Sequence, residues 1–492
     1  MTGDLPDLIA RRAALTPERT ALEDAASGRT LSYAALDARA ARVAALLAAR
    51  GIGAGDRIAV LTRNRIAFFE LLFGCAKAGA ILVPLNWRMP PAELAGLIAD
   101  AGPRLLFRGA EEAGAAAMLG LPAIDFDGDY DALLATVASA PSRPRWPAAE
   151  TWYLIYTSGT TGAPKGVIYT YRMALANHLN IGTAIGLTGA DTTASFLPIF
   201  HTAGINLHAL PTLFAGGRVI VMDGFDAETL VGLLEARRLD TVFGVPTVYQ
   251  SLLHHPRFAA APLDTVRHWG CGGAPLPDAL ALRYRDLGVR VCNGMGMTET
   301  GPTAFLLDPA DAWDRIGSVG KPQLLCSARV VGPDGREAAA GEVGDLHFAG
   351  PGVTPGYWRN EEATRAAFTA DGWLRSGDLA RRDADGFYWI AGRRKEMFIS
   401  GGENVYPAEV ENVLSAHPAV AEAAVLGEVD AKWGEVGRAF VRLAPDRSRP
   451  DPNELTAFCR ERLAPYKVPR RIEFVAEFPR TSAGKIQKHL LA

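Results

Sequence analysis

The sequence lacks several features that would place the chain in a specialised class of protein. Its five cysteines are widely spaced and include no CxxC pair, so neither a disulfide framework nor a zinc site is expected. Basic residues do not outnumber acidic ones, and the formal net charge is −3. This balance gives no electrostatic reason to bind nucleic acid or an anionic membrane. Internal repeats and low-complexity linkers are also missing. We therefore expect no nucleic-acid partner.

Long hydrophobic runs are scarce as well. The most apolar window covers residues 68–86, and Glu70, Lys77 and Pro84 interrupt it. It falls short of an uninterrupted bilayer span, so we interpret it as a buried helix that runs into a strand. The first 15 residues contain early acids and no apolar core of a secretory signal. These observations predict a cytoplasmic protein without a membrane span, and they leave open whether it is a monomer or a homodimer.

The length of 492 residues exceeds what one hydrophobic core usually supports, so at least two domains are expected. Helical and strand patterns alternate over most of the first 300 residues, which favours βα units with strands buried on both faces. From about residue 317, short strands separated by PDG and ADG turns predict a meander or distorted barrel. We predict an α/β protein with a large N-terminal domain over residues 1–391 and a small C-terminal α+β domain over 392–492. The large domain would combine βα sheets with a distorted β-barrel.

The stretch YTSGTTGAPKG, residues 156–166, concentrates hydroxyl groups and glycines directly after a predicted strand. Hydroxyl donors combined with inward-facing backbone amides can cradle a polyphosphate. The stretch is not a Walker A loop, because Lys165 lies between Pro164 and Gly166. The alternative is a flexible surface loop. The residues that would form the cradle are Thr157, Ser158, Gly159, Thr160 and Thr161.

Seven further motifs follow this loop along the chain. They are LPIFHTAG (197–204), CGGAPLP (271–277), GMTETG (296–301), SGDL (376–379), GRRKE (392–396), ISGGENVYPAEVE (399–411) and PRTSAGK (479–485). In this order they resemble the motifs of the adenylate-forming enzymes, which include acyl-CoA synthetases, 4-coumarate- and feruloyl-type CoA ligases, peptide-synthetase adenylation domains and firefly luciferase. The likeness spans essentially the whole chain. It implies that the small domain swivels on a hinge between two half-reactions.

The resemblance implies an ATP site. The loop at 157–161 would hold the phosphates, and Lys165 would help to anchor that loop. Asp378 and Arg393 would bind the ribose hydroxyls, although an isolated Asp378 would equally suit a turn. Met295 stands where relatives commonly carry an aromatic residue that stacks on adenine. The strip against which the adenine would slide is Gly273, Ala274 and Pro275.

Three charged residues would carry the chemistry and the domain motion. Glu299 follows Thr298 in GMTE, and a Thr–Glu pair beside a phosphate loop suits nucleotide-bound Mg²⁺, a hard cation that prefers oxygen ligands. By resemblance, Glu299 is the Mg²⁺ ligand and Thr298 lies at the α-phosphate. Lys485 would bridge the substrate carboxylate and the α-phosphate, the alternative being a tail lysine exposed to water. Lys395 matches the hinge position.

The acid and thiol sites are also implied by resemblance. His201 stands where amino-acid-activating relatives usually carry an aspartate, so an α-amino acid is disfavoured; in CoA ligases this position gates access of the thiol. The alternative for His201 is a packed histidine. Gly401 and Gly402 would line the pantetheine channel of CoA. The predicted acid pocket comprises Phe200, His201, Asn206, Phe243, Cys271 and Met295.

The sequence therefore predicts an AMP-forming acid–thiol ligase that uses ATP, Mg²⁺ and CoA. Its substrate would be a small-molecule carboxylic acid, aromatic or otherwise apolar. A medium- or long-chain fatty acid–CoA ligase is one alternative. Others are an adenylating enzyme that loads a carrier protein, an oxygen-dependent activity like that of luciferase, and a nucleotide-binding protein without ligase turnover.

Overall fold

Two large sheets form the framework of the N-terminal part of the chain. The computed structural model describes residues 3–138, 143–157, 164–445, 447–481 and 485–491. The smaller of the two sheets has six strands, in the order β10 (Lys165–Thr170), β9 (Thr151–Thr157), β5 (Ile81–Leu85), β4 (Arg57–Leu61), β6 (Leu105–Arg108) and β7 (Ala123–Asp125). The larger has nine, in the order β17 (Lys321–Pro322), β16 (Phe305–Leu306), β15 (Val291–Met295), β14 (His268–Cys271), β13 (Thr241–Gly244), β11 (Thr192–Ser195), β12 (Arg218–Val221), β2 (Thr20–Asp24) and β3 (Thr30–Ser32).

The nine-stranded sheet brings several strand ends together. Strand β11 runs parallel to β12 and β13, and β13, β14 and β15 are parallel to one another in turn. The carboxyl ends of parallel strands meet at the same edge of a sheet, which is where open α/β sheets bind their ligands. Ser195, Phe243, Cys271 and Met295 occupy the ends of these strands and therefore share that edge.

Helices α2 (Tyr33–Ala49) and α3 (Ile66–Ala78) pack against each other, and α3 contacts both β5 and β2, so it lies between the two sheets. Residues of both helices and both sheets share one large hydrophobic core. The predicted buried helix running into a strand is thus confirmed as α3 and β5. The charges inside it are paired: Lys77 Nζ lies 2.7 Å from Asp7 Oδ2, and Glu70 Oε1 lies 2.6 Å from Arg39 Nε.

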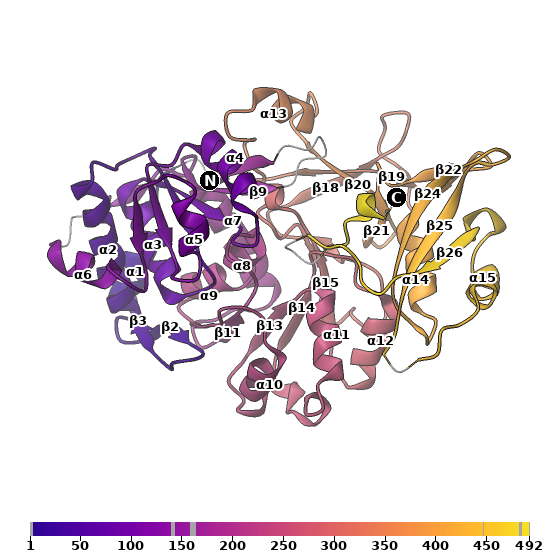
Figure 1. Cartoon of the computed structure of the whole chain (residues 1–492), viewed down its shortest axis with the longest axis horizontal. Coiled ribbons are helices and arrows are strands. Elements are labelled where there is room, and N and C mark those ends of the chain that lie inside the picture. The colour runs from indigo at the N-terminus through magenta and orange to yellow at the C-terminus, as the bar shows by residue number, and fades with distance from the viewer. Residues whose placement is uncertain (1–2, 139–142, 158–163, 446, 482–484, 492) are drawn as a thin grey trace.

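Two smaller sheets follow. Strands β18 (Ser327–Val331), β19 (Val343–Ala349), β20 (Leu374–Arg382) and β21 (Tyr388–Arg393) form an antiparallel meander, as the PDG and ADG turns predict. The last sheet contains β23 (Glu403–Val405), β22 (Phe398–Ser400), β25 (Gly434–Leu443) and β24 (Val420–Asp430), with β26 (Arg471–Phe474) beside β25. Helices α14 (Pro407–Ser415) and α15 (Pro452–Arg460) share its separate hydrophobic core. Figure 1 shows this C-terminal unit, in orange and yellow, at the opposite end of the molecule from helices α2 and α3, in indigo to purple.

The mixed α/β architecture with a smaller C-terminal α+β unit agrees with the predicted fold class. The predicted boundary between residues 391 and 392 falls within β21, and it stays a prediction. Within the described residues, no helix is both long and apolar enough to cross a membrane. The helices that follow β10 along the chain, up to β15, are α7 (Tyr171–Ala184), α8 (Thr202–Asn206), α9 (Ala209–Ala215), α10 (Ala227–Glu235), α11 (Pro246–His254) and α12 (Asp278–Asp286). The remaining helices of five residues or more are α1 (Leu8–Leu15), α4 (Pro91–Ala101), α5 (Ala113–Ala117), α6 (Tyr130–Thr136) and α13 (Glu361–Ala367).

Candidate active site

The predicted phosphate loop connects the antiparallel strands β9 and β10, where Thr157 pairs with Lys165 across the ladder. The ammonium of Lys165 lies over the ring of Tyr357, 5.3 Å from its centroid. Tyr357 in turn donates a hydrogen bond of 3.0 Å from its hydroxyl to Oε1 of Glu299. Lys165 therefore packs at the base of the loop, on the residue that contacts Glu299. The other predicted cradle residues, Ser158, Gly159, Thr160 and Thr161, lie outside the described residues.

Glu299 and Thr298 lie in the short 3₁₀ helix Thr298–Thr300 that follows β15, and both are buried. Burial raises the pKa of the Glu299 carboxyl, because an ionised group is costly to remove from water. The hydrogen bond from Tyr357 and the charges of Arg393 and Lys485 act in the opposite direction. The structure thus places a carboxylate in a dry position with positive charge nearby.

Asp378 and Arg393 face each other in the register of β20 and β21. Arg393 Nε lies 2.9 Å from Asp378 Oδ1, and Arg393 Nη1 donates a hydrogen bond of 3.1 Å to the carbonyl of Ser376. The backbone N–H of Asp378 donates to the Ser376 hydroxyl. Burial raises the pKa of Asp378, and its Oδ2 is buried without a hydrogen-bond partner among the described residues. Because buried acceptors are nearly always satisfied, Oδ2 is suited to a ligand hydroxyl.

Lys485 comes from the C-terminal end of the chain, yet its ammonium interacts electrostatically with Asp378, Glu299 and Arg393. The backbone around it is closed by a 2.7 Å hydrogen bond from Thr481 N–H to the Lys485 carbonyl. Although the residue retains exposed surface, desolvation and the charge of Arg393 lower the pKa of Lys485, while the two carboxylates partly offset this. The tertiary structure therefore brings Lys485 close to the carboxyl groups of Glu299 and Asp378.

His201 immediately precedes α8, beside Phe200, whose ring centroid is 5.0 Å from that of the imidazole. Burial, together with the positive charges of Lys485 and Arg88, lowers the pKa of His201 to about 4. The imidazole is therefore neutral at near-neutral pH. It supplies no anion for a substrate ammonium, and its interaction with Lys485 places it next to the charged centre.

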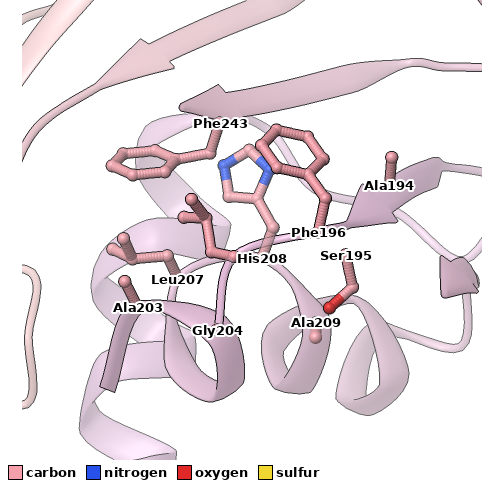
Figure 2. Close-up of a pocket in the computed structure, with 10 residues that line it drawn as sticks. Ala194, Ser195, Phe196, Ala203, Gly204, Leu207, His208, Ala209 and Phe243 are labelled. Atoms are coloured by element: carbon pink, nitrogen blue, oxygen red, sulfur yellow. The ribbon is translucent and has the colours of Figure 1, made fainter. Parts of the chain in front are cut away.

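A small cavity of about 10 Å³ is lined by residues of α8 and of neighbouring segments (Figure 2). Of the predicted pocket residues, Phe243 lines it. His208 and Ser195 also line it. Neither was predicted, because neither belongs to a motif and each reaches the cavity only through the packing of α9 and β11. The full lining is Ala194, Ser195, Phe196, Leu197, Ala203, Gly204, Leu207, His208, Ala209 and Phe243.

Two other predicted pocket residues are engaged in packing. Asn206 is fully buried, accepts a hydrogen bond of 2.7 Å from the Tyr153 hydroxyl and donates one of 3.0 Å to Thr202 Oγ1. Cys271 is fully buried in a core cluster with residues of α11. These contacts favour structural roles for both residues, and their contact with a substrate stays a prediction.

The remaining predicted residues lie in loops and turns. Gly273, Ala274 and Pro275 follow β14, and Met295, half-buried, ends β15. Gly401 and Gly402 form the turn between β22 and β23 at positive φ, and a Cβ on Gly401 would meet the Trp433 ring at 2.7 Å. Lys395 is exposed in the turn between β21 and β22. Their roles toward adenine, CoA and the hinge stay predictions.

The donor set for a metal ion is small. Over the residues that the structure describes, no group of three or more His, Cys, Asp or Glu side chains could hold a metal ion. Mg²⁺ is commonly held by one or two carboxylates together with substrate phosphates. The buried Glu299 carboxylate fits a Mg²⁺ ion that arrives with a nucleotide and takes its other ligands from phosphate oxygens.

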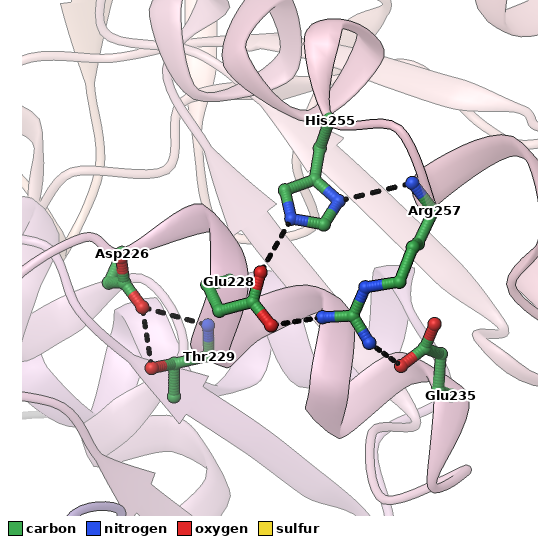
Figure 3. Close-up of polar contacts among 6 residues, drawn as sticks. All are labelled: Asp226, Glu228, Thr229, Glu235, His255 and Arg257. Atoms are coloured by element: carbon green, nitrogen blue, oxygen red, sulfur yellow. Dashed lines mark hydrogen bonds and ion pairs between the residues drawn. The ribbon is translucent and has the colours of Figure 1, made fainter.

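A surface network fixes the helices that flank β13 in the chain (Figure 3). Asp226 caps α10 by accepting a 2.8 Å hydrogen bond from Thr229 N–H. Glu228 of α10 contacts His255 Nε2 at 3.0 Å and also pairs with Arg257. Arg257 lies 2.7 Å from Glu235 at the end of α10. These contacts join α10 to the segment after α11 and so support the strand that carries Phe243.

The chain is similar over nearly its whole length to several known proteins. Feruloyl-CoA synthase from Amycolatopsis sp is 42% identical over 486 residues, which cover 97% of this chain and 96% of that protein. Indoleacetate–CoA ligase from Aromatoleum aromaticum is 36% identical, with 99% and 97% covered. Among solved structures, the anthranilate CoA ligase AuaEII in complex with anthranoyl-AMP matches with a TM-score of 0.93 at 28% identity, covering 100% of this chain and 97% of that one. ATP-bound MatB from Rhodopseudomonas palustris matches with a TM-score of 0.91 at 33% identity, with 99% and 98% covered.

The family described as AMP-binding enzyme matches residues 9–358, and its C-terminal domain matches residues 409–485. The first of these matches covers more than half of the chain and contains Glu299, while the second reaches Lys485. The shared fold, the extent of both matches and the charged centre lead to one conclusion. The chain belongs to the AMP-binding enzyme family.

Proposed function

We propose that this protein is an ATP-dependent carboxylic acid–CoA ligase that forms AMP and acts on an aromatic or other apolar acid. The observation that carries the proposal is the charged centre, in which Asp378, Arg393, Glu299 and Lys485 interact although they come from three distant segments. Three of the relatives named above are named as CoA synthases or ligases, and the acids in their names, ferulate, indoleacetate and anthranilate, are aromatic.

In the first half-reaction, a carboxylate oxygen of the acid attacks the α-phosphorus of ATP, and the bond from that phosphorus to the bridging oxygen breaks. The products are an acyl-adenylate and pyrophosphate. Lys485 would bind the acid's carboxylate and the α-phosphate together, holding the reacting atoms close and offsetting the negative charge that develops. The unpartnered Asp378 Oδ2 would accept a hydrogen bond from a ribose hydroxyl, with Arg393 holding the other carboxylate oxygen in place.

Glu299 would hold the Mg²⁺ that accompanies ATP, and this ion withdraws negative charge from the phosphate oxygens. The chain's own contribution is a buried carboxyl whose pKa is raised by burial. The Tyr357 hydroxyl and the charges of Arg393 and Lys485 oppose that rise and so favour the ionised form. Thr298, next to Glu299, would contact the α-phosphate.

In the second half-reaction, the CoA sulfur attacks the acyl carbon, the bond to the AMP oxygen breaks, and the thiol proton passes to solvent. Lys485 has no role in this step, so rotation about the turn at Lys395 would withdraw it and bring Gly401 and Gly402 to the thiol. The neutral His201 beside Lys485 would separate the acid site from the thiol's path. A cytoplasmic location and a monomeric or homodimeric state form part of the proposal.

The test is acid-dependent AMP release, measured with and without CoA over a panel of aromatic, fatty and amino acids. We expect release with aromatic acids, acceleration by CoA, and acyl-CoA as the product. No AMP with any acid would contradict the ligase.

Two results would select the alternatives. The "Fatty acid--[acyl-carrier-protein] ligase ScoC" from Streptomyces coeruleorubidus is 36% identical over 94% of this chain, so a carrier-protein acceptor is a specific rival. AMP release that ignores CoA and responds to a carrier protein would favour that rival. Turnover of fatty acids alone would favour a fatty acid–CoA ligase.

A further inference from the structure

A buried histidine outside the charged centre has an unused ring nitrogen. His208 directly precedes α9 and is only 5% exposed. Its Nδ1 lies 3.3 Å from both Thr193 Oγ1 and Thr241 Oγ1. Its Nε2 is buried and has no hydrogen-bond partner within the described part of the chain. Buried polar groups are nearly always hydrogen-bonded, so such a nitrogen indicates an absent partner.

The space in front of His208 is the cavity described above, which at about 10 Å³ holds one water-sized group. Figure 2 shows the imidazole beside the Phe243 ring, whose centroid is 5.5 Å away. The hydroxyl oxygen of Ser195, another lining residue, is also buried without a partner among the described residues. The cavity is therefore largely apolar, and His208 and Ser195 supply its unpartnered polar atoms.

The charge state of His208 limits which kind of ligand group could bind beside it. Burial and the neighbouring His268 lower the pKa of His208 to about 3, so the ring is neutral at near-neutral pH. Its neighbours are the two threonine hydroxyls, His268 with a pKa lowered to about 4, and phenylalanine rings. Nothing among these groups would compensate a second carboxylate or an ammonium. A hydroxyl matches, because it both donates and accepts and so suits either tautomer of the ring.

The position of His208 indicates which end of the acid it would meet. His201, beside Lys485, precedes α8, and Ala203, Gly204 and Leu207 of the same segment line the cavity. The helix between His201 and His208, α8, has five residues and rises by roughly 7.5 Å, and the two histidines lie on either side of it. This distance is comparable to the length of a phenylpropenoic acid whose carboxylate lies at Lys485.

We propose that His208 is a specificity-determining residue whose Nε2 hydrogen-bonds a hydroxyl at the end of the acid remote from its carboxylate. The inference rests on the proposed function and deepens it: the preferred acid has an apolar, aromatic body and a distal hydroxyl. Acids that carry a second charged group at that end would be excluded.

The test compares 4-hydroxyphenylpropenoic acid with phenylpropenoic acid, which differ only by the distal hydroxyl. For the wild-type enzyme, kcat/KM in CoA-dependent AMP release should be at least about tenfold higher for the hydroxylated acid. His208→Phe should bring the ratio close to one, and His208→Gln, which keeps an amide donor and acceptor, should retain part of it. His178→Phe is the matched control, because His178 is a largely buried histidine of α7 outside the cavity, and its ratio should match the wild type.

Binding of the same two acids, measured by calorimetry with an ATP analogue that cannot be cleaved at the α-phosphate, separates the two proposals. A hydroxyl preference in binding that His208→Phe abolishes would support His208 even if no AMP were released; the absence of AMP would then overturn only the proposed reaction. Equal binding of both acids by the wild type would overturn the role of His208, and this comparison requires no variant to fold. A preference that survives in a folded His208→Phe protein would overturn it as well.

Discussion

The charged centre and the cavity at His208 are built on opposite principles. At the centre, the charges of Arg393 and Lys485 act on the pKa values of the Glu299 and Asp378 carboxyls, and one of the four residues comes from the C-terminal unit. At the cavity, the polar groups are neutral, the walls are largely apolar, and every lining residue lies between positions 194 and 243. The charged centre suits phosphate chemistry, which is common to all substrates. The neutral cavity suits the choice among acids.

This difference predicts that a substitution in one region leaves the function of the other region intact. Changes at the charged centre should alter the use of ATP or the adenylation rate for every acid. Changes at the cavity should alter the KM of particular acids and leave the KM of ATP unchanged. The following substitutions test that separation, beginning with the largest expected effect.

Replacing Lys485 with alanine should lower the rate of acyl-adenylate formation by about 10²–10³-fold, because it removes the charge placed at the reacting phosphate. Thioester formation from supplied acyl-AMP should be spared. Lys165→Ala is the matched comparison: its ammonium packs on Tyr357, an interaction worth about 0.5–1 kcal/mol, so a two- to fivefold loss is expected. Pyrophosphate release and single-turnover thioester assays measure the two steps. Loss of both steps in Lys485→Ala would refute its assigned role.

Asp378→Asn should raise the KM for ATP by about 10- to 100-fold. The substitution removes a charge-assisted hydrogen bond to the ribose and leaves Arg393 without its carboxylate partner. The KM for the acid should change little. Asp371→Asn provides a control, since Asp371 also pairs with an arginine but is exposed. Initial rates with ATP and acid varied independently supply both constants. An equal rise in the two values would contradict the division between the regions.

Phe243→Leu should raise the KM for an aromatic acid by roughly tenfold, since a few missing carbon atoms in an apolar pocket are worth about 1–3 kcal/mol. The KM for ATP should be unchanged. Phe258→Leu removes the same atoms from a buried position beside Trp269, away from the cavity, and should leave both constants unaltered. If Phe243→Leu weakened ATP binding instead, the cavity and the nucleotide site would be one unit.

Tyr357→Phe tests the acid side of the pH profile and should have the smallest effect. Burial raises the pKa of Glu299, so its anionic form is lost as pH falls through that raised value. The Tyr357 hydroxyl lowers this pKa. Its removal should therefore raise the pKa and move the acid limb of the pH profile of kcat/KM for ATP to higher pH by less than about one unit. The phenylalanine ring still supports Lys165. A shift to lower pH, or no shift, would show that Glu299 does not control this limb.

Most of the charged centre could be predicted from the sequence, because its residues lie in short, contiguous motifs. Asp378 in SGDL, Glu299 in GMTE and Lys485 in PRTSAGK are each recognisable without the structure. The cavity could not be predicted in the same way. Asn206 is bonded to Tyr153 and Thr202 and Cys271 is packed in the core, and their contact with a substrate stays a prediction. His208, which does line the cavity, follows LPIFHTAG but belongs to no motif.

The sequence by itself determined the element order, the α/β class and the residue types available for phosphate chemistry. These properties follow from hydrophobic periodicity and from local spacing, which survive in a linear chain. Only the tertiary structure decided that Lys485 lies beside residues more than 90 positions away, that Asp378 Oδ2 is left without a partner, and that His208 closes a neutral cavity. Each depends on burial and on which segments pack together, so the same residues at the same spacing would lack these properties in another fold.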